Sequence, residues 1–305
     1  MPLLSICIPC YGRVEYVRNT LKSIYIDNAD VSIDDYEIII SDNNPEQTIK
    51  LIVREFQHNT NLKYYYTDCE GFMNSYYVLK YATGDFIKLH NSQTIFKKNS
   101  IRQILQDIKN LQSHRSLIFY TNGLISNLPQ TTIHYQNFED FMYNLSYWSS
   151  WSNGFCIWNE DLKKIGEIEL NKLFPHTSIF LTQTNNSSYI INNQSLFDVQ
   201  RIPKRGGHNK FQAFTIEYPS LIDECYNSSH ISEKCRNHIL DDILKEFLPS
   251  LLFNKYIARI ETFDSTGYHK NIKKYFPKHA FWKTWLYVPL VPFKILYRKI
   301  KQKIK

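Results

Sequence analysis

The sequence predicts an α/β fold in which a mostly parallel sheet is flanked by helices. In the amino-terminal part of the chain, short apolar runs alternate with longer stretches in which apolar residues recur at every third or fourth position. The runs are typical of buried strands, and the stretches have the periodicity of amphipathic helices. Strands that alternate with helices form right-handed βαβ units and hence a parallel sheet. A chain of 305 residues is long enough to bury a full core.

The first expected strands and helices are separated by turn-forming residues. Residues 3–8 are an apolar run bounded by prolines, which is typical of a central strand, and residues 14–26 place Val17, Leu21 and Ile24 on one helical face. By the same patterns, strands are expected at 36–40, 62–66 and 85–89, and helices at 48–56, 72–82 and 101–111.

The later part of the chain is expected to be less regular and then helical. Further strands are expected at 117–120, 124–126, 153–158 and 189–192, with a helix that begins near Pro175. Helices are expected at 211–225, 231–247 and 251–260, because their apolar residues lie three and four positions apart. The sequence contains no internal repeat and no low-complexity segment.

Charge is unevenly distributed along the chain. The formal net charge is +7, yet no acid follows Asp264. The basic residues after that point are Lys270, Lys273, Lys274, Lys278, Lys283, Lys294, Arg298, Lys299, Lys301, Lys303 and Lys305. The body of the protein is therefore mildly acidic, and the tail is the part expected to seek an anionic partner.

Residues 279–305 interleave these bases with aromatic and aliphatic residues. The longest uncharged run, 284–293, contains two prolines and is far shorter than the roughly 20 residues that a membrane-spanning helix needs. We expect this segment to lie on an anionic membrane surface. Nucleic-acid binding and a solvated tail are the alternatives, but neither explains so much apolar surface, so no nucleic-acid partner is expected.

Six cysteines are scattered through the chain, and the amino terminus lacks a positively charged, apolar, cleavable leader. These features indicate a reducing, cytoplasmic environment. Cys7 and Cys10 form a Cys-x-x-Cys pair, but Cys7 falls within an expected strand and no second pair follows at zinc spacing. Cys7 is expected to be a small buried hydrophobe, with a redox or metal role as the alternative.

The stretch GDFIKLHNSQTIF, residues 84–96, is an apolar strand followed by a polar turn. Ligands of open α/β sheets bind beyond the carboxyl ends of the strands, so this turn is a candidate site. Together with the LLSICIPCYGR run at the amino terminus, it resembles the family 2 glycosyltransferases of the GT-A fold. The resemblance implies a nucleotide-sugar donor. It also aligns Asn91, Ser92 and Gln93 with the family's metal-binding Asp-x-Asp motif, so the carboxylates of that motif are missing here.

The resemblance assigns the donor's base to residues after the first two strands. Pro9, Tyr11 and Arg13 match the family's Pro-x-Tyr-Asn turn, although Gly12 replaces the asparagine. Tyr11 offers a stacking face, and Arg13 a cation near the phosphates. Asp42 matches the acid that contacts the base or ribose. An ordinary strand-to-helix turn for Tyr11 and an Asx turn or helix cap for Asp42 are the alternatives.

The diphosphate is assigned to Asn91 and Gln93, whose amide groups can donate hydrogen bonds directly. Because Mg²⁺ and Mn²⁺ prefer anionic oxygen, we expect no metal site, with weak binding of either ion as the alternative. A decayed site is the competing interpretation. The basic loop of Lys204, Arg205 and His208 is expected to stabilise the leaving group, or else to be a surface linker.

The proton of the acceptor hydroxyl requires a base. The family usually places an acid pair at the start of a helix, whereas this chain has His176 after Pro175, which looks like the Pro-His variant of abequosyltransferase-like relatives. A lone histidine is more often a cap or a core residue. The Glu160-Asp161 pair is the second candidate, although it also suits a helix cap.

These assignments divide the chain into four parts. Residues 1–112 are the nucleotide-sugar-binding half of a GT-A domain, 113–210 the acceptor-binding half, 211–278 a helical region and 279–305 the membrane-surface segment. The expected function is sugar transfer to a lipid-linked or surface polysaccharide, of capsule or lipopolysaccharide type, at the cytoplasmic face of the plasma membrane. A catalytically inactive nucleotide-sugar-binding or scaffold protein is the alternative.

Overall fold

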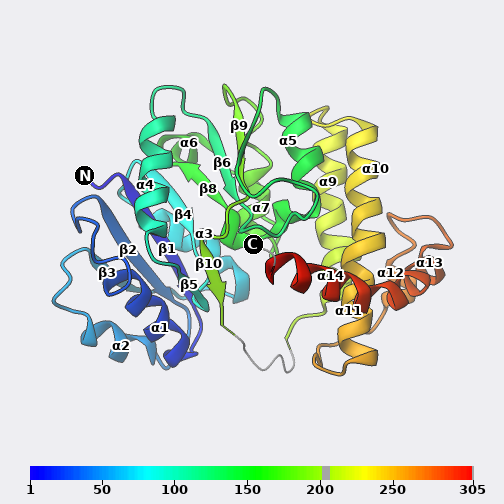
Figure 1. The fold of residues 1–305 in the computed structure, drawn as a ribbon, viewed down its shortest axis with the longest axis horizontal. Helices are drawn as coiled ribbons and strands as arrows, with labels where there is room; N and C mark the ends of the chain where they lie inside the picture. The colour runs from blue at the N-terminus through cyan, green and yellow to red at the C-terminus, as the bar shows by residue number, and fades with distance from the viewer. Residues whose placement is uncertain (201–206, 304–305) are drawn as a thin grey trace. The chain divides into compact units, whose positions relative to one another are not determined.

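The computed structural model describes residues 1–200 and 207–303, with side chains described up to residue 297. The chain divides into two compact units. The first comprises Met1–Phe141 and Trp148–Arg201, and the second comprises Met142–Tyr147 and Ile202–Lys305. In Figure 1 the first unit carries the strands, and the second is the helical part coloured yellow to red.

The first unit is built on a five-stranded sheet with strand order β3-β2-β1-β4-β8. Its strands are β1 (Leu4–Cys10), β2 (Tyr36–Asp42), β3 (Leu62–Tyr66), β4 (Phe86–Leu89) and β8 (Cys156–Trp158). The first four are parallel, and β8 is antiparallel to β4. The predicted α/β class with a mostly parallel sheet is therefore confirmed.

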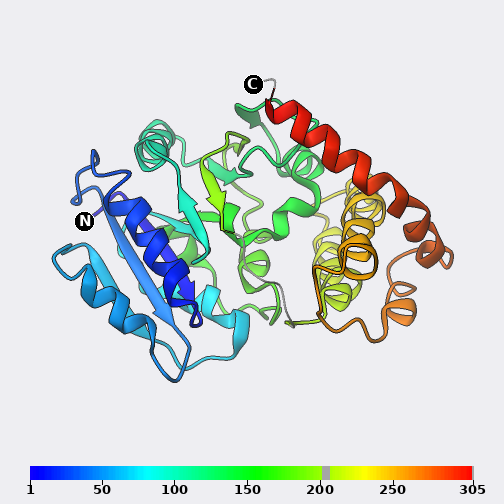
Figure 2. The ribbon, with the colours of Figure 1, turned by 60° about the horizontal axis from the view of Figure 1, so that its bottom comes forward.

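Helices cover this sheet as the apolar periodicity requires. They are α1 (Val14–Tyr25), α2 (Ile49–Glu55), α3 (Asn74–Lys80) and α4 (Ser100–Leu111). Figure 2 shows α1 and α2 side by side along one face of the sheet. Leu4 and Ile6 of β1 share a buried cluster with Leu21 of α1 and Ile104 of α4. Alternate strand residues such as Cys7 and Ile39 are also fully buried, so both faces of the central strands are covered.

Two smaller sheets complete the first unit. One has the order β6-β9-β7, and in the other β10 is antiparallel to β5. Their strands are β5 (Thr94–Phe96), β6 (Leu117–Tyr120), β7 (Thr132–Tyr135), β9 (Tyr189–Asn192) and β10 (Phe197–Val199). The connecting helices are α5 (Phe138–Leu145), which crosses the boundary between the units, α6 (Asn159–Lys164) and α7 (Pro175–Phe180), with the short 3₁₀ turns η1 (Gly71–Met73), η2 (Ser146–Ser150) and η3 (Ser152–Gly154).

The strand predicted at 124–126 is wrong. Asn122 and Gly123 both have positive φ, of 56° and 72°, so the chain turns away from an extended course just before this segment. The Asn193 side chain then holds the loop: its Nδ2 donates to the carbonyl oxygens of Ile125 at 3.0 Å and of Pro129 at 3.1 Å. Hydrogen bonds from one side chain therefore replace the backbone hydrogen bonds that a strand would make here.

The second unit is helical, and its long helices contain π-helical turns. The elements are α8 (Lys210–Gln212), η4 (Ala213–Glu217), α9 (Tyr218–Asn227), α10 (Glu233–Asp242), η5 (Ile243–Phe247), α11 (Leu248–Leu252) and η6 (Phe253–Ile257). Two of these π turns end just before Pro219 and Pro249. A proline lacks the N–H of the helical ladder and clashes with the preceding turn, and the wider π turn accommodates it without ending the helix.

The end of the chain folds into α12 (Tyr268–Asn271), α13 (Ala280–Tyr287), the 3₁₀ turn η7 (Val288–Leu290) and α14 (Val291–Lys303). Within the described ranges, no helix combines the length and the apolar character needed to cross a bilayer. All six cysteines are free, and Cys7 is fully buried, as predicted for a small core residue.

Candidate functional site

The carboxyl ends of β1, β2 and β4 meet at one edge of the main sheet. In the register of the strands, Cys10 lies opposite Asp42, and Cys7 lies opposite Leu89. The His90 amide extends this alignment past β4 by donating to the Cys7 carbonyl at 2.8 Å. The three turns that carry the predicted donor residues therefore begin at the same edge, where open α/β sheets bind ligands.

The turn from β1 into α1 has an unusual backbone. Gly12 and Arg13 both have left-handed φ, of 62° and 58°, which glycine tolerates and arginine adopts only at a cost. Pro9 lies within β1 opposite Ser41, while Tyr11 projects outward and is 66% exposed. The turn thus presents an accessible ring beside a conformationally constrained cation.

Arg13 and Gln93 come together although they are 80 residues apart. The guanidinium Nη1 of Arg13 donates to Oε1 of Gln93 at 2.9 Å. Since a guanidinium has no acceptor, the atom of Gln93 that faces it must be the oxygen, and the amide NH₂ of Gln93 is left for another partner. This contact joins the turn after β1 to the turn after β4.

Asn91 is held from the other side by η3. Its backbone N–H donates to Oδ1 of Asn153 at 2.8 Å, and its side-chain Oδ1 accepts from Oγ of Ser152 at 2.8 Å. The bond from Ser152 engages the side-chain oxygen and leaves the Asn91 NH₂ for another partner. Gly154 lets this segment approach β6: a Cβ at that position would lie 2.1 Å from Cε1 of Phe119.

A buried lysine lies behind this turn. Lys88 of β4 is fully buried, and its ammonium donates to the carbonyl oxygens of Asn153 at 2.5 Å and of Leu89 at 3.1 Å. The ring of Phe197 lies 4.7 Å from the ammonium. Burial lowers the pKa of Lys88 to about 8, because the charged form is poorly solvated there.

The Asn91 and Gln93 side chains do not fit a divalent cation. Mg²⁺ and Mn²⁺ bind oxygen, and both side-chain oxygens already accept from donors, one of which is a guanidinium cation. Across the described residues, no three His, Cys, Asp or Glu side chains group closely enough to hold a metal ion. The turn instead combines two side-chain amides with a fixed positive charge.

Asp42 ends β2 and is buried. Its Oδ1 accepts from the Asn44 amide at 3.0 Å, which is the Asx turn considered as an alternative, and its Oδ2 accepts from the Tyr64 hydroxyl at 3.2 Å. Burial raises the pKa of Asp42, and these two hydrogen bonds oppose that rise. Each carboxylate oxygen has two lone pairs, so the chain's own bonds leave acceptor capacity.

Asn74 is a structural residue of the site that the sequence analysis missed. Its Nδ2 donates to the carbonyl oxygens of Cys10 at 3.2 Å and of Ser41 at 2.8 Å, and its Oδ1 accepts from the Ser41 hydroxyl at 2.5 Å. One buried amide therefore joins the ends of β1 and β2. A single asparagine at the start of a predicted helix carries no sequence signal for this role.

His176 is the second residue of α7, directly after Pro175. Its Nε2 lies 3.0 Å from the Ser150 carbonyl oxygen, so Nε2 carries the proton and Nδ1 carries the lone pair. Ser150 lies two residues before Ser152, and Ser152 and Asn153 make the hydrogen bonds to Asn91. Burial lowers the pKa of His176 to about 4.

Three polar atoms of α7 and η3 are buried without a hydrogen-bond partner in the part of the chain that the structure describes. Among the described residues, Nδ1 of His176, Oγ1 of Thr177 and Nδ2 of Asn153 are buried and make no hydrogen bond. Such atoms are rare in folded proteins and indicate a position that a ligand or water completes. His90 Nδ1 is also unpaired, but that ring is stacked on Phe96 within the core.

The remaining predicted residues have different outcomes. Lys204 and Arg205 fall outside the described residues, so their role stays a prediction. His208 belongs to the second unit, where burial lowers its pKa. Glu160 and Asp161, the second candidates for the base, form ion pairs with Arg115 at 3.0 and 3.5 Å. Both acids lie in the first turn of α6, whose N-cap makes no side-chain hydrogen bond.

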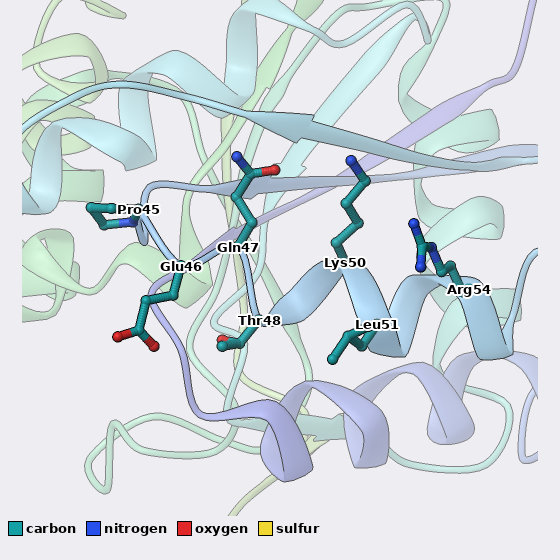
Figure 3. A pocket seen from close by; sticks show the side chains of 7 residues that line it. All are labelled: Pro45, Glu46, Gln47, Thr48, Lys50, Leu51 and Arg54. Atoms are coloured by element: carbon teal, nitrogen blue, oxygen red, sulfur yellow. The ribbon is translucent and has the colours of Figure 1, made fainter.

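A hollow of about 350 Å³ lies at the start of α2. It is lined by Pro45, Glu46, Gln47, Thr48, Lys50, Leu51 and Arg54. Figure 3 shows that Gln47, Lys50 and Arg54 extend to one side of this segment, whereas Glu46 points the opposite way. None of the predicted site residues lines it.

Comparison with known proteins places this geometry in context. The sequence model described as glycosyl transferase family 2 matches residues 5–157. A validoxylamine A glucosyltransferase from Streptomyces hygroscopicus subsp. jinggangensis (strain 5008) is 28% identical over 72 residues, which is 24% of this chain and only 17% of that protein.

Two solved structures of S. aureus TarS resemble the whole chain. The structure of TarS 1–349 has a TM-score of 0.58 at 16% identity, and its complex with UDP-GlcNAc has a TM-score of 0.59 at 17% identity. Each match covers 98% of this chain and 92% of the TarS chain. At such identity the likeness concerns the fold.

Proposed function

This chain belongs to glycosyl transferase family 2, and we propose that it moves a sugar from a nucleotide-sugar donor to a lipid-linked or surface polysaccharide with weak or no dependence on a divalent cation. The observation that carries the proposal is the bond between Arg13 and Gln93. It puts a permanent cation in the turn where Asp-x-Asp members of the family hold a metal ion.

Charge balance explains how the site operates. Two carboxylates and a divalent ion sum to zero, and so do two amides alone. Arg13 adds one positive charge, which suits the diphosphate that leaves as the sugar is transferred. The amides of Asn91 and Gln93, whose oxygens accept from Ser152 and Arg13, have NH₂ groups free to donate to phosphate oxygens.

The nucleoside end of the donor would lie over the ends of β1 and β2. The exposed ring of Tyr11 suits stacking on a base. Pro9 lies in β1, two residues before Tyr11. Asp42 is proposed to contact a base or ribose group with its remaining acceptor capacity, since it already accepts from Asn44, Tyr64 and the Ile49 backbone. The TarS structure solved with UDP-GlcNAc has the same fold.

The transfer is a displacement at the anomeric carbon. The acceptor hydroxyl oxygen forms the new bond to that carbon, the bond from the carbon to the diphosphate oxygen breaks, and the nucleoside diphosphate departs. His176 accepts the hydroxyl proton on Nδ1, which is unprotonated at neutral pH because burial lowers the pKa to about 4. Its Nε2–H bond to Ser150 fixes the ring for this task.

The test is donor binding and turnover with and without metal. Calorimetry with a panel of nucleotide-sugars would identify the donor. Donor hydrolysis or transfer would then be measured in EDTA and in added Mn²⁺. We expect EDTA to change turnover little and Arg13→Met to lower it by roughly 10²-fold or more. Arg18→Met is the matched control, because Arg18 lies five residues later, in α1, and pairs with Glu15 and Glu55.

The outcomes are distinct. Strong dependence on Mn²⁺ or Mg²⁺ would overturn the metal-free part of the proposal. Equal loss in the Arg13 and Arg18 variants would show that Arg13 acts only through stability. Binding of a nucleotide-sugar without turnover on any acceptor would favour the inactive binding protein considered above.

A further inference from the structure

The last two long helices carry an unpartnered apolar face. Large hydrophobic side chains on α13, η7 and α14 are strongly exposed, at 67% for Trp282, 76% for Leu286, 70% for Phe293 and 63% for Tyr297. Leu290, at 46%, and Leu296, at 56%, belong to the same face. The steps from 282 to 286, 290, 293 and 297 are four, four, three and four residues, which place these side chains along one side of a helix. We call these six residues the tail face.

The opposite side of the same helices is packed. Ala280, Thr284, Val288 and Val291 are buried and follow the same spacing, two residues out of step with the tail face. The Thr284 hydroxyl bonds to the Tyr268 hydroxyl at 2.9 Å, and Lys294 pairs with Glu246 at 3.3 Å. The helices are thus anchored to the second unit in an orientation that turns the tail face outward.

The charge of this region selects its partner. No acid occurs after Asp264, and the basic residues Arg298, Lys299, Lys301, Lys303 and Lys305 follow directly on the tail face in the sequence. A protein partner could cover the apolar side chains, but the run of bases without acids is matched by anionic headgroups. Trp and Tyr are also the residues that favour the boundary between headgroups and acyl chains.

We infer that the tail face docks this protein on an anionic lipid bilayer, with α13 and α14 lying in the plane of the headgroups. Trp282, Leu286 and Phe293, whose side chains are strongly exposed, enter the acyl boundary. The inference rests on the proposed function in one respect, since a lipid-linked acceptor would lie in the same bilayer. The docking itself involves no residue of the transfer site.

The experiment is flotation of the full chain with vesicles of phosphatidylcholine alone and of phosphatidylcholine mixed with phosphatidylglycerol. We expect binding to the mixed vesicles, weak binding to the neutral ones and release at high salt. The triple variant Trp282→Ser, Leu286→Ser and Phe293→Ser is expected to lower vesicle affinity at least about tenfold. Because these side chains are exposed, the variant keeps its packed core.

A control variant replaces three exposed hydrophobic residues of the first unit. Ile26→Ser, Leu51→Ser and Val199→Ser remove side chains that are 65%, 61% and 56% exposed. This control should bind the mixed vesicles as the unmodified chain does. Equal loss in both triple variants would overturn the inference, because the effect would then follow total exposed apolar area and not the tail face.

Other occupants of the tail face give different results. A concentration-dependent dimer that the tail-face variant abolishes, without vesicle binding, would assign the face to a second copy of the chain. Retention on nucleic acid but not on anionic vesicles would assign the tail to nucleic acid. Either result overturns the inference. Donor binding by the tail-face variant separates the two proposals, because it should persist even if membrane docking fails.

Discussion

The Lys88 ammonium donates to the carbonyl oxygen of Asn153 at 2.5 Å. Asn153 in turn accepts the backbone N–H of Asn91 on its side-chain oxygen at 2.8 Å. A fully buried cation is therefore connected, through one residue, to the turn proposed to hold the diphosphate. Its neighbours are carbonyl oxygens and ring faces, which solvate the charge only in part.

The first prediction concerns stability at alkaline pH. The pKa of Lys88 is about 8 in the folded chain, below its ordinary value of 10.5, so between these values the unfolded state binds more protons. The free energy of unfolding should rise with pH across this window, by up to about 3 kcal/mol, and the burial penalty is fully present below pH 8. Lys88→Met should remove this rise in urea titrations between pH 8 and 9.5. An unchanged slope would contradict the assignment.

The second prediction concerns the proposed base. His176→Gln should lower turnover by about 10² to 10⁴-fold, the range typical of a lost general base, while donor affinity stays within twofold of the unmodified chain. The glutamine NH₂ can still donate to the Ser150 carbonyl, so the contact seen at 3.0 Å has a substitute. Steady-state kinetics and calorimetry together provide the check. Loss of donor binding in parallel with turnover would mean that His176 is structural.

The third prediction is acid sensitivity from the same imidazole. Its folded pKa is about 4 against 6.5 when unfolded, so the stability that it contributes is present above pH 6.5 and is lost as pH falls toward 4. The loss is about 3 kcal/mol. Denaturant unfolding at pH 7 and pH 5 should show a smaller difference for His176→Gln than for the unmodified chain. His90, whose pKa burial also lowers, should keep part of the difference in the variant.

The fourth prediction concerns Gln93, in the turn after β4, whose amide nitrogen is replaced by a carboxylate oxygen. Gln93→Glu would pair a carboxylate with Arg13, neutralise the guanidinium and add a negative charge where the diphosphate is proposed to bind. Donor affinity should fall by about tenfold or more, and the fall should shrink as salt is added. Gln57→Glu, on an exposed residue after α2, is the control for the same change of surface charge. Tighter donor binding in Gln93→Glu only when Mn²⁺ is present would point back to a metal site.

The sequence predicted the layered sheet well because each βαβ unit is a local pattern. The first four strands and the helices between them are recognisable from runs of neighbouring residues. The pairing of β5 with β10 was not predicted, since three-residue strands that are about one hundred residues apart carry no local signal. The prediction of a strand after β6 was wrong for another reason. The loop there is held by hydrogen bonds from Asn193, which is distant in the sequence.

The site shows the same division. Arg13, Asn91 and Gln93 were each identified in the sequence, but the bond between Arg13 and Gln93 depends on how two turns approach in space. Ser152 was missed, and Asn153 was hidden within an expected strand, whereas the structure has a 3₁₀ turn there. Side chains that position other side chains have no periodicity, so a single sequence cannot reveal them.

The close approach at Gly154 makes the tightness of the Asn91 turn depend on the neighbouring sheet. Any larger residue there would collide with Phe119 and with the Tyr120 carbonyl oxygen, which would lie only 2.6 Å from the added Cβ, and would push Ser152 and Asn153 away from the amide that they hold. A saturation library over residues 150–155 should therefore accept almost no change at 154. Selecting such a library for activity with the donor would then show how closely residue 154 must pack against β6.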